Sequence, residues 1–491
     1  MRRKIILFFV LILATIGLHY FAPRAISVFF FLSTLVAYFY AKDEAFWLAY
    51  FLVLSDGFFG LLGTWEAVFS VIPGLPAIEV VQFYILITLF KARKAPLAKL
   101  PFFSMQLNII FIYLLFLVIQ GYVIGLSGAL NVQFRVVKYL VPLFLFYSIP
   151  RLIKEESQFR EIMAYLFPVA FFALGAQLFS ITMGREPAQV FGFILGGQDF
   201  FEISEEQIYR GLFNFCILII TFFGALYFLS TKDHNFKPLY LTGIIAADYL
   251  TVFLSATRGW IIGFSMIIVL YAIFVSTFSF KHLLKTFLAV TLILFVLISI
   301  PAVNIQIHNA YNRMWTLDAM AQGDITAGGT LLRLNERGPR VMKKWRESPL
   351  TGFGFSDDFF HFADGHVANQ NILLHSGIVG AFLMGWFFLV FNGKIFLRSF
   401  KLPRQNPLKR TLLVFNIVFL GWFLIHSSSG QHFTFYQITN LGIIQALFFS
   451  FGSLVYQKSF MVKKENHVPV QKDLASKPIK KSVKTFADFP T

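Results

Sequence analysis

Long apolar runs dominate the pattern of hydrophobic and polar positions, and they recur from the N-terminus almost to residue 457. Many approach or exceed about 18 residues, the length that an α-helix needs to cross a bilayer. The alternating segments of about ten residues that build a β-barrel do not occur in the sequence. The pattern therefore predicts an all-α polytopic integral membrane protein.

The runs predict about fourteen transmembrane helices. They cover residues 5–21, 25–40, 45–62, 77–90, 105–126, 136–149, 162–182, 211–230, 239–256, 260–278, 284–302, 372–391, 411–425 and 437–456. Two of them, 77–90 and 136–149, are short for a bilayer crossing. We therefore expect 12–14 transmembrane helices, and we read the first as a retained helix rather than a cleaved signal sequence.

Composition and charge support this class. Hydrophobic residues make up 57% of the 491 positions and charged residues only 14%, which excludes an ordinary soluble domain. The net charge of +17 does not require nucleic acid as a partner, because most Lys and Arg fall in alternate loops and in the C-terminal tail. The positive-inside rule then predicts a multi-pass membrane protein with both termini in the cytoplasm.

Loop lengths suggest the domain organisation. Residues 1–210 form the N-terminal helices and end in an external loop, 183–210. Residues 211–391 include a second and larger external (periplasmic) loop, 303–370, which contains enough aromatic residues to fold. C-terminal helices follow at 392–457, and a basic cytoplasmic tail, expected to be disordered, covers 458–491. Long loops in compact proteins often carry function, so the chemistry is expected in the second region.

Arginine residues mark the predicted external side. Arg210 enters one helix and Arg258 stands in a tight turn between two others. Arg258 is either a snorkelling anchor, a partner of Asp248, or a fixed cation for phosphate, which guanidinium binds through two parallel hydrogen bonds. Farther along, Arg333, Arg337 and Arg340 recur at helical spacing, in two short helices of which the second begins at Pro339.

That basic stretch is either a solvated face or a wall that attracts an anionic substrate. Just before the helix at 372–391 stands a polar cluster that contains His366 and Asn369. A histidine there suits general-base work on a hydroxyl, although a lone histidine is more often structural. No metal-binding pattern accompanies it; adjacent Asp357 and Asp358 are only a weak pair for a divalent ion.

Nucleotide-binding motifs such as a Walker loop or a Rossmann glycine pattern do not occur in the sequence. An enzyme facing outward would therefore need a preactivated donor delivered by the membrane. A polyprenyl-diphosphate-linked sugar has this property, since it presents a diphosphate at the outer lipid boundary.

The motifs "SATRGWIIGF", "SPLTGFGF" and "GHVANQNILLHSGIVG", separated by a long loop, resemble those of the O-antigen ligase and O-antigen polymerase superfamily. The matching positions are Thr257–Gly259, Pro349–Gly354, His366, and Gly377 with Gly380; "YRGLFN" at Arg210 resembles a further upstream segment. In the family an Asn follows the His, but here Val367 does. The amide then comes from Asn369 or Asn371, or His366 is not the equivalent residue.

The resemblance implies a metal-independent, inverting glycosyltransferase of cell-envelope polysaccharide or lipopolysaccharide biosynthesis. The enzyme would act on the outer face of the bacterial inner (cytoplasmic) membrane. Its donor would be an undecaprenyl-diphosphate-linked glycan and its acceptor a glycan or lipid hydroxyl, with membrane lipids around it and no cofactor. Arg210 and Arg258 would hold the diphosphate. Arg333, with Arg337, Arg340 and Asn369, would bind substrate, and His366 would activate the acceptor hydroxyl.

A transporter or flippase of lipid-linked oligosaccharide is the alternative. It predicts charges deep in several helices and little mass outside the membrane. Only Asp56 and Asp248 are clear intramembrane charges here, which favours the enzyme. A membrane scaffold would explain neither Arg258 nor the long loop.

Overall fold

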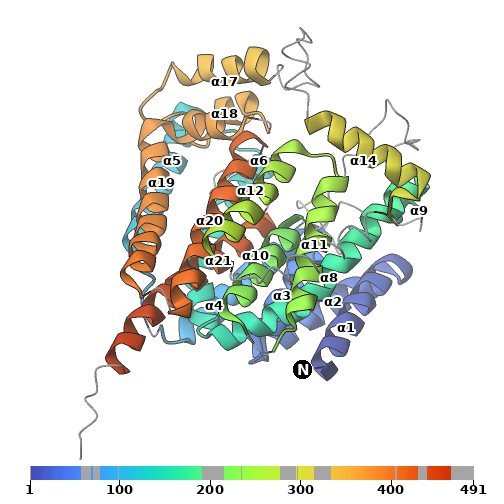
Figure 1. Cartoon of the computed structure of the whole chain (residues 1–491). Coiled ribbons are helices and arrows are strands. Elements are labelled where there is room, and N and C mark those ends of the chain that lie inside the picture. The colour runs from blue at the N-terminus through green and yellow to red at the C-terminus, as the bar shows by residue number, and fades with distance from the viewer. Residues whose placement is uncertain are drawn as a thin grey trace, which may run out of the picture.

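The computed structural model describes residues 2–56, 68–69, 78–97, 99–190, 215–233, 235–276, 295, 297–314, 333–365, 367–403, 406–429 and 439–465. The protein is nearly all helical, which confirms the predicted class (Figure 1). Across the described residues, one antiparallel pair of two-residue strands is the only sheet, with β1 (Val68–Phe69) beside β2 (Ile78–Glu79). The hydropathy pattern did not predict these strands, because two residues carry no periodic signal.

Where residues are described, the helices follow the predicted apolar runs. Most of the predicted helix 284–302 and of the predicted loop 183–210 lies outside the described residues. Their bounds are α1 Arg2–Phe21, α2 Arg24–Tyr40, α3 Glu44–Ser55, α4 Val80–Lys94, α5 Ser104–Ile124, α6 Leu130–Leu140, the 3-10 helix η2 Val141–Phe144, α7 Leu145–Leu152, α8 Glu156–Met183, α9 Pro187–Val190, α10 Phe215–Thr231, α11 Pro238–Leu254, α12 Arg258–Phe274, α14 Pro301–Met314, the π turn η4 Arg333–Arg337, α17 Gly338–Trp345, α18 Asp357–Phe362, α19 Ala368–Lys401, α20 Pro407–Ser429 and α21 Thr439–Glu465.

Within the described part of the chain, six helices are long and apolar enough to cross a membrane. They are Arg2–Phe21, Ser104–Ile124, Leu130–Leu152, Glu156–Met183, Ala368–Lys401 and Pro407–Ile425. Shorter apolar helices, such as α11 and α12, pack beside them. Six helices of this kind support a membrane protein, whereas the number 12–14 stays a prediction.

Aromatic rings fill the centre of the bundle, where α8, α10, α20 and α21 meet. The ring of Phe159 stacks on that of Phe451 with centroids 3.9 Å apart. Phe223 contacts Phe415 and Phe448, each at 5.0 Å. Aromatic side chains bury large areas with few rotatable bonds, so this cluster holds four helices together at low entropic cost.

Ion pairs tie the helices together at the end of the molecule where the chain begins. Lys4 reaches both Asp43 and Glu161, at 2.7 and 2.8 Å. Lys91 pairs with Glu44 at 2.7 Å and also donates to the carbonyls of Tyr38 and Ala41 at the end of α2. Lysine at a helix C-terminus satisfies carbonyls that the helix itself leaves open.

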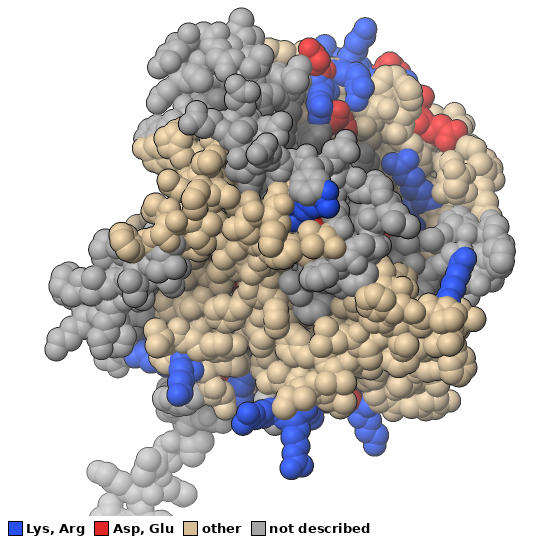
Figure 2. Space-filling view, turned by 90° about the vertical axis from the view of Figure 1, so that its right-hand side faces the viewer, with Lys and Arg blue, Asp and Glu red and all other residues tan. Residues whose placement is uncertain are grey.

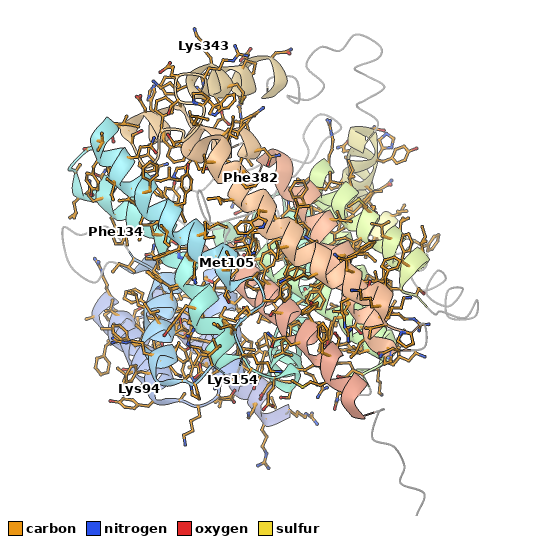
Figure 3. The ribbon with its side chains drawn as sticks, turned by 90° about the vertical axis from the view of Figure 1, so that its left-hand side faces the viewer. Lys94, Met105, Phe134, Lys154, Lys343 and Phe382 are labelled. Atoms are coloured by element: carbon orange, nitrogen blue, oxygen red, sulfur yellow. The ribbon has the colours of Figure 1, made fainter. Side chains whose placement is uncertain are left out.

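The two ends of the molecule are polar, and the surface between them is mostly apolar. Figure 2 shows Lys and Arg along the lower edge, charged residues of both signs near the upper edge, and mostly tan side chains between. Figure 3 places Lys94 and Lys154 at the lower end and Lys343 at the upper end, with Met105 and Phe382 between them. Met105 is 64% exposed and Phe382 is 69% exposed, as expected of side chains that face lipid.

Two segments depart from the predicted boundaries. The predicted loop 303–370 is helical at its start, because α14 covers Pro301–Met314 and packs on α8 and α11. Gln306 of α14 donates to the carbonyl of Leu254 at 2.7 Å. At the other end, α21 continues to Glu465, beyond residue 457 where the predicted helices ended.

Candidate functional site

A turn formed by Pro349–Gly354 lies at the upper end of the bundle, after α17. Gly352 and Gly354 have φ values of +66° and +56°, in the left-handed region that favours glycine. A Cβ on Gly352 would lie 2.6 Å from the backbone of His375, and one on Gly354 would lie 2.4 Å from the carbonyl oxygen of Leu117. The turn is therefore wedged between the backbones of two helices.

One of these helices, α19, is broken where the turn meets it. Gly377 has φ +63° and ψ −166°, outside the helical region. The carbonyls of Leu374 and His375 accept from the amides of Phe353 and Gly354, each at 2.8 Å. Beyond the break, the amides of Ile378 and Val379 donate back to the carbonyls of Pro349 and Leu350, at 3.0 and 3.1 Å. Backbone groups freed by a break in an apolar helix need such partners.

The other helix is α5, and it contributes polar groups to the same junction. Gln120 donates to the hydroxyl of Thr351 and to the carbonyl of Gly352, both at 2.9 Å. The hydroxyl of Tyr113 donates to the carbonyl of Ser376 at 2.6 Å. The "SPLTGFGF" and "HSGIVG" motifs thus build one backbone junction, which we call the turn–helix junction.

A small apolar cluster lies above this junction and joins α17, α18 and the start of α19. It comprises Val341, Phe353, Phe359, Val367 and Leu374. Ser356 caps α18 by accepting from the amide of Phe359 at 3.3 Å. Val367 is buried in this cluster, so the start of α19 is held against α17 and α18.

Asp364 is the central polar residue of this unit. Its carboxylate lies 3.8 Å from Arg337 and 3.3 Å from Arg340. Its backbone is held by Asn371, whose side-chain oxygen accepts from the Asp364 amide at 3.0 Å and whose amide group donates to the Asp364 carbonyl. Sequence reasoning missed Asp364, because its arginine partners lie more than 20 positions away in the chain.

Asp364 and its arginine partners form part of a pocket of about 510 Å³ that is open to solvent. Its lining consists of Glu336, Arg337, Arg340, Ala363, Asp364 and Gly365. The side chains of Arg337 and Arg340 are 38% and 53% exposed, so both remain accessible from the pocket or solvent. A guanidinium carries five N–H groups, and one carboxylate cannot occupy them all.

The structure shows different surroundings for Asn369 and Asn371, the two residues that could replace the family asparagine absent at position 367. Asn371 is buried and holds Asp364, which is a structural role. Asn369 is exposed on the first turn of α19 and is available to a ligand. Sequence reasoning could not separate them, because both lie within the first four residues of the same helix.

Other charged side chains of this region contact structural partners. Lys344 lies 2.7 Å from Glu347 and 2.9 Å from Asp358, and hydrogen bonds to Glu347 and Asp358 raise the pKa of Lys344. Asp357 accepts instead from the amide of Ser127 at 3.1 Å. The adjacent carboxylates of Asp357 and Asp358 thus face different partners, which argues against the divalent-ion pair.

Arg258 lies at the same end of the bundle but on another helix. It is the first residue of α12, follows the N-cap Thr257, and is half-buried. Asp248, one of its expected partners, is fully buried and accepts from Thr221 of α10 at 3.0 Å. The predicted tight turn is confirmed, with Ala256 in a left-handed conformation at φ +51°.

The other intramembrane carboxylate, Asp56, also has a structural contact. It accepts from the amide of Ile217 at 2.8 Å, near the start of α10. An acceptor there satisfies one of the amides that begin a helix without a partner. A second histidine of this region, His375, is buried edge-on against the rings of Phe355 and Phe359, with centroids 4.5 and 4.6 Å away.

Three predicted site residues are not placed by the structure. Arg210 and His366 lie outside the described residues, and of Arg333 only the backbone, in η4, is described. The neighbours of residue 366 are placed: Gly365 lines the pocket and Val367 belongs to the buried cluster. The structure thus brings two of the predicted substrate-binding residues, Arg337 and Arg340, together on Asp364.

Within the described residues, no group of three or more His, Cys, Asp or Glu side chains is arranged to hold a metal ion. Comparison of the sequence with models of known protein families and with curated proteins finds no match.

Proposed function

We propose that this protein is a membrane glycosyltransferase that transfers or polymerises a glycan from a polyprenyl-diphosphate-linked donor onto a hydroxyl acceptor. The observation that carries the proposal is the pocket at Asp364, where Arg337 and Arg340 converge and Gly365 completes the lining. The resemblance of the same segments to the O-antigen ligase and polymerase superfamily supports it.

In the proposed reaction the acceptor hydroxyl attacks the anomeric carbon of the donor sugar. The bond from that carbon to the diphosphate oxygen breaks, and the polyprenyl diphosphate leaves with the electron pair. His366 takes the proton of the hydroxyl as general base. Fixed cations stabilise the charge that develops on the leaving group, and we assign this role to Arg258 and Arg210.

Arg337 and Arg340 are proposed to bind the anionic or sugar portion of a substrate. Asp364 holds both guanidiniums at 3.3 to 3.8 Å, which restricts their motion while leaving donors exposed. Preorganised donors lose less entropy on binding than free arginine side chains would. The external location of this unit and the cytoplasmic location of both termini, in the inner membrane of a bacterium, are part of the proposal.

The test is reconstitution of the purified full-length protein with a polyprenyl-diphosphate glycan and candidate acceptors, without added metal. Release of polyprenyl diphosphate is measured. We expect Arg258→Gln and His366→Ala each to lower turnover by about 100-fold or more. Arg340→Gln should weaken substrate binding by roughly tenfold, since it removes one charge-assisted contact.

Lys343→Gln is the matched control. Lys343 is exposed on α17, carries the same charge as Arg340, and does not line the pocket. Unchanged turnover in both the Arg258 and His366 variants would overturn the site assignment. Transbilayer movement of the donor without bond cleavage would replace the enzyme by the flippase.

A further inference from the structure

A second pocket lies at the opposite end of the molecule from α17. It has a volume of about 300 Å³ and is formed by the connection between α4 and α5, the end of α7 and the last turns of α21. Its lining includes Lys99, Lys154, Lys458, Ile153, Leu454 and Ser450. We call it the basal pocket. The basal pocket has no part in the proposed glycosyl transfer, so a proposal for its ligand is independent of the proposed function.

Three lysines from three different segments converge on the basal pocket. Lys458 pairs with Glu156 at 2.6 Å, so part of its charge is already balanced. Lys99 and Lys154 are exposed, and no carboxylate of the described residues lies within salt-bridge distance of either. The rim of the pocket therefore carries an excess of positive charge that a bound anion would balance.

Ser450 supplies an independent observation. Its side chain is only 7% exposed, and its hydroxyl has no hydrogen-bond partner among the described residues. A buried hydroxyl without a partner costs free energy unless a ligand or water satisfies it. Because Ser450 lines the basal pocket, a ligand with an oxygen acceptor would remove this cost.

The remaining lining is apolar. Ile153 is buried at the end of α7, and Leu454 faces the pocket one turn after Ser450 on α21. The pocket thus combines cations at its rim, one hydroxyl in its wall and hydrocarbon beside it. Control of membrane orientation accounts for lysines at this end, but it requires neither a cavity nor an unsatisfied serine.

We propose that the basal pocket binds the phosphate-bearing head group of an anionic phospholipid from the adjacent leaflet. Lys99 and Lys154 contact the phosphate, Ser450 donates to one of its oxygens, and the glycerol and first acyl carbons lie against Ile153 and Leu454. Basic pockets between membrane helices suit this chemistry, because cations and hydrocarbon are offered together.

The experiment measures lipid binding to the full-length protein, delipidated in detergent, by native mass spectrometry. Dioleoyl phosphatidylglycerol and dioleoyl phosphatidylcholine are titrated separately. We expect one phosphatidylglycerol to bind in clear preference to phosphatidylcholine. The double variant Lys99→Gln/Lys154→Gln should weaken that binding by roughly tenfold or more. Ser450→Ala should weaken it by about two- to tenfold.

The matched control is Lys42→Gln/Lys94→Gln, which removes two exposed lysines from the same end of the molecule but outside the pocket. It should bind phosphatidylglycerol like the wild type. Equal loss in the two double variants, or equal binding of the two lipids, would overturn the proposal. Displacement of phosphatidylglycerol by millimolar inorganic phosphate would also overturn it, because a free phosphate would then be the ligand.

Discussion

Glycine at position 377 combines two constraints that no other residue type meets. Its φ and ψ of +63° and −166° lie in a region that is almost exclusive to glycine. A Cβ there would also lie 2.2 Å from the carbonyl oxygen of Leu350. The glycine that the sequence marked as part of a motif is thus needed for a backbone contact rather than for contact with substrate.

Gly377→Ala is therefore expected to lower the free energy of unfolding by at least about 2 kcal/mol, from backbone strain and from the clash with Leu350. The midpoint of thermal unfolding in detergent measures it. Gly385→Ala is the matched control, since Gly385 lies on the same helix with nothing within 4 Å of its added Cβ. It should be neutral or stabilising by up to about 1 kcal/mol. Equal midpoints for the two variants would contradict this account of the break.

Single residues of the candidate site were predictable to different degrees. The recurrence of Arg337 and Arg340 at helical spacing indicated one face, and both reach one carboxylate. Asp364 was missed, because the pairing joins residues 24 positions apart and leaves no local pattern. The structural role of Asn371 was equally invisible, since a buried and an exposed asparagine look alike in the sequence.

At the scale of elements, α10 depends on a partner far away in the chain. Asp56, at the end of α3, accepts from the amide of Ile217 near the start of α10, 161 positions later. An acceptor at a helix N-terminus also interacts favourably with the helix dipole. This contact explains an acidic residue inside an apolar region without assigning it to transport.

Asp56→Leu should therefore destabilise the protein by about 1–3 kcal/mol, because the amide of Ile217 loses a buried acceptor. Asp56→Asn keeps an oxygen at the same position and should cost less than half as much. Thermal unfolding in detergent compares the two variants. Equal destabilisation would contradict the capping role. A loss of function in a correctly folded Asp56→Asn protein would instead favour a carboxylate that takes part in transport.

Helix positions were the most predictable feature, because long apolar runs carry a strong signal. The limits of that signal are seen at α14 and α19. The helix α14 is polar enough to read as a loop, and only its packing on α8 and α11 reveals it. The break in α19 falls inside an apolar run, where hydropathy cannot distinguish a straight helix from two pieces.

For the whole molecule, the two ends use their charged residues differently. The lower end joins helices through Lys4, Lys91 and Lys458, while the upper end carries α17 and its pocket. The pairs of Lys4 and Lys458 are half-exposed and stabilise little individually, so their place at the polar end is more informative than their energy. Between the two ends few charged side chains are seen in Figure 2, and exposed side chains such as Met105 and Phe382 are apolar, as a bilayer requires.

The proposed orientation predicts which end of the molecule a membrane-impermeant reagent reaches in intact cells. A Cys at position 343 should be labelled by a membrane-impermeant maleimide in intact spheroplasts, whereas a Cys at position 94 should react only after permeabilisation. Both residues are exposed, and Figure 3 places them at opposite ends. The natural Cys216 is buried and provides a low background. Labelling of both positions, or of position 94 alone, in intact cells would reverse or reject the orientation.

The turn–helix junction also affects what proteolytic cleavage of the chain would do to the fold. Backbone hydrogen bonds join Pro349 and Leu350 to Ile378 and Val379, and so close the intervening chain into a ring without a covalent bond. A protease that cleaves after the exposed Gly365 would open the ring at one point only. Each new end would remain anchored, one through the turn and one through α19, so a nicked protein would stay assembled until it is denatured.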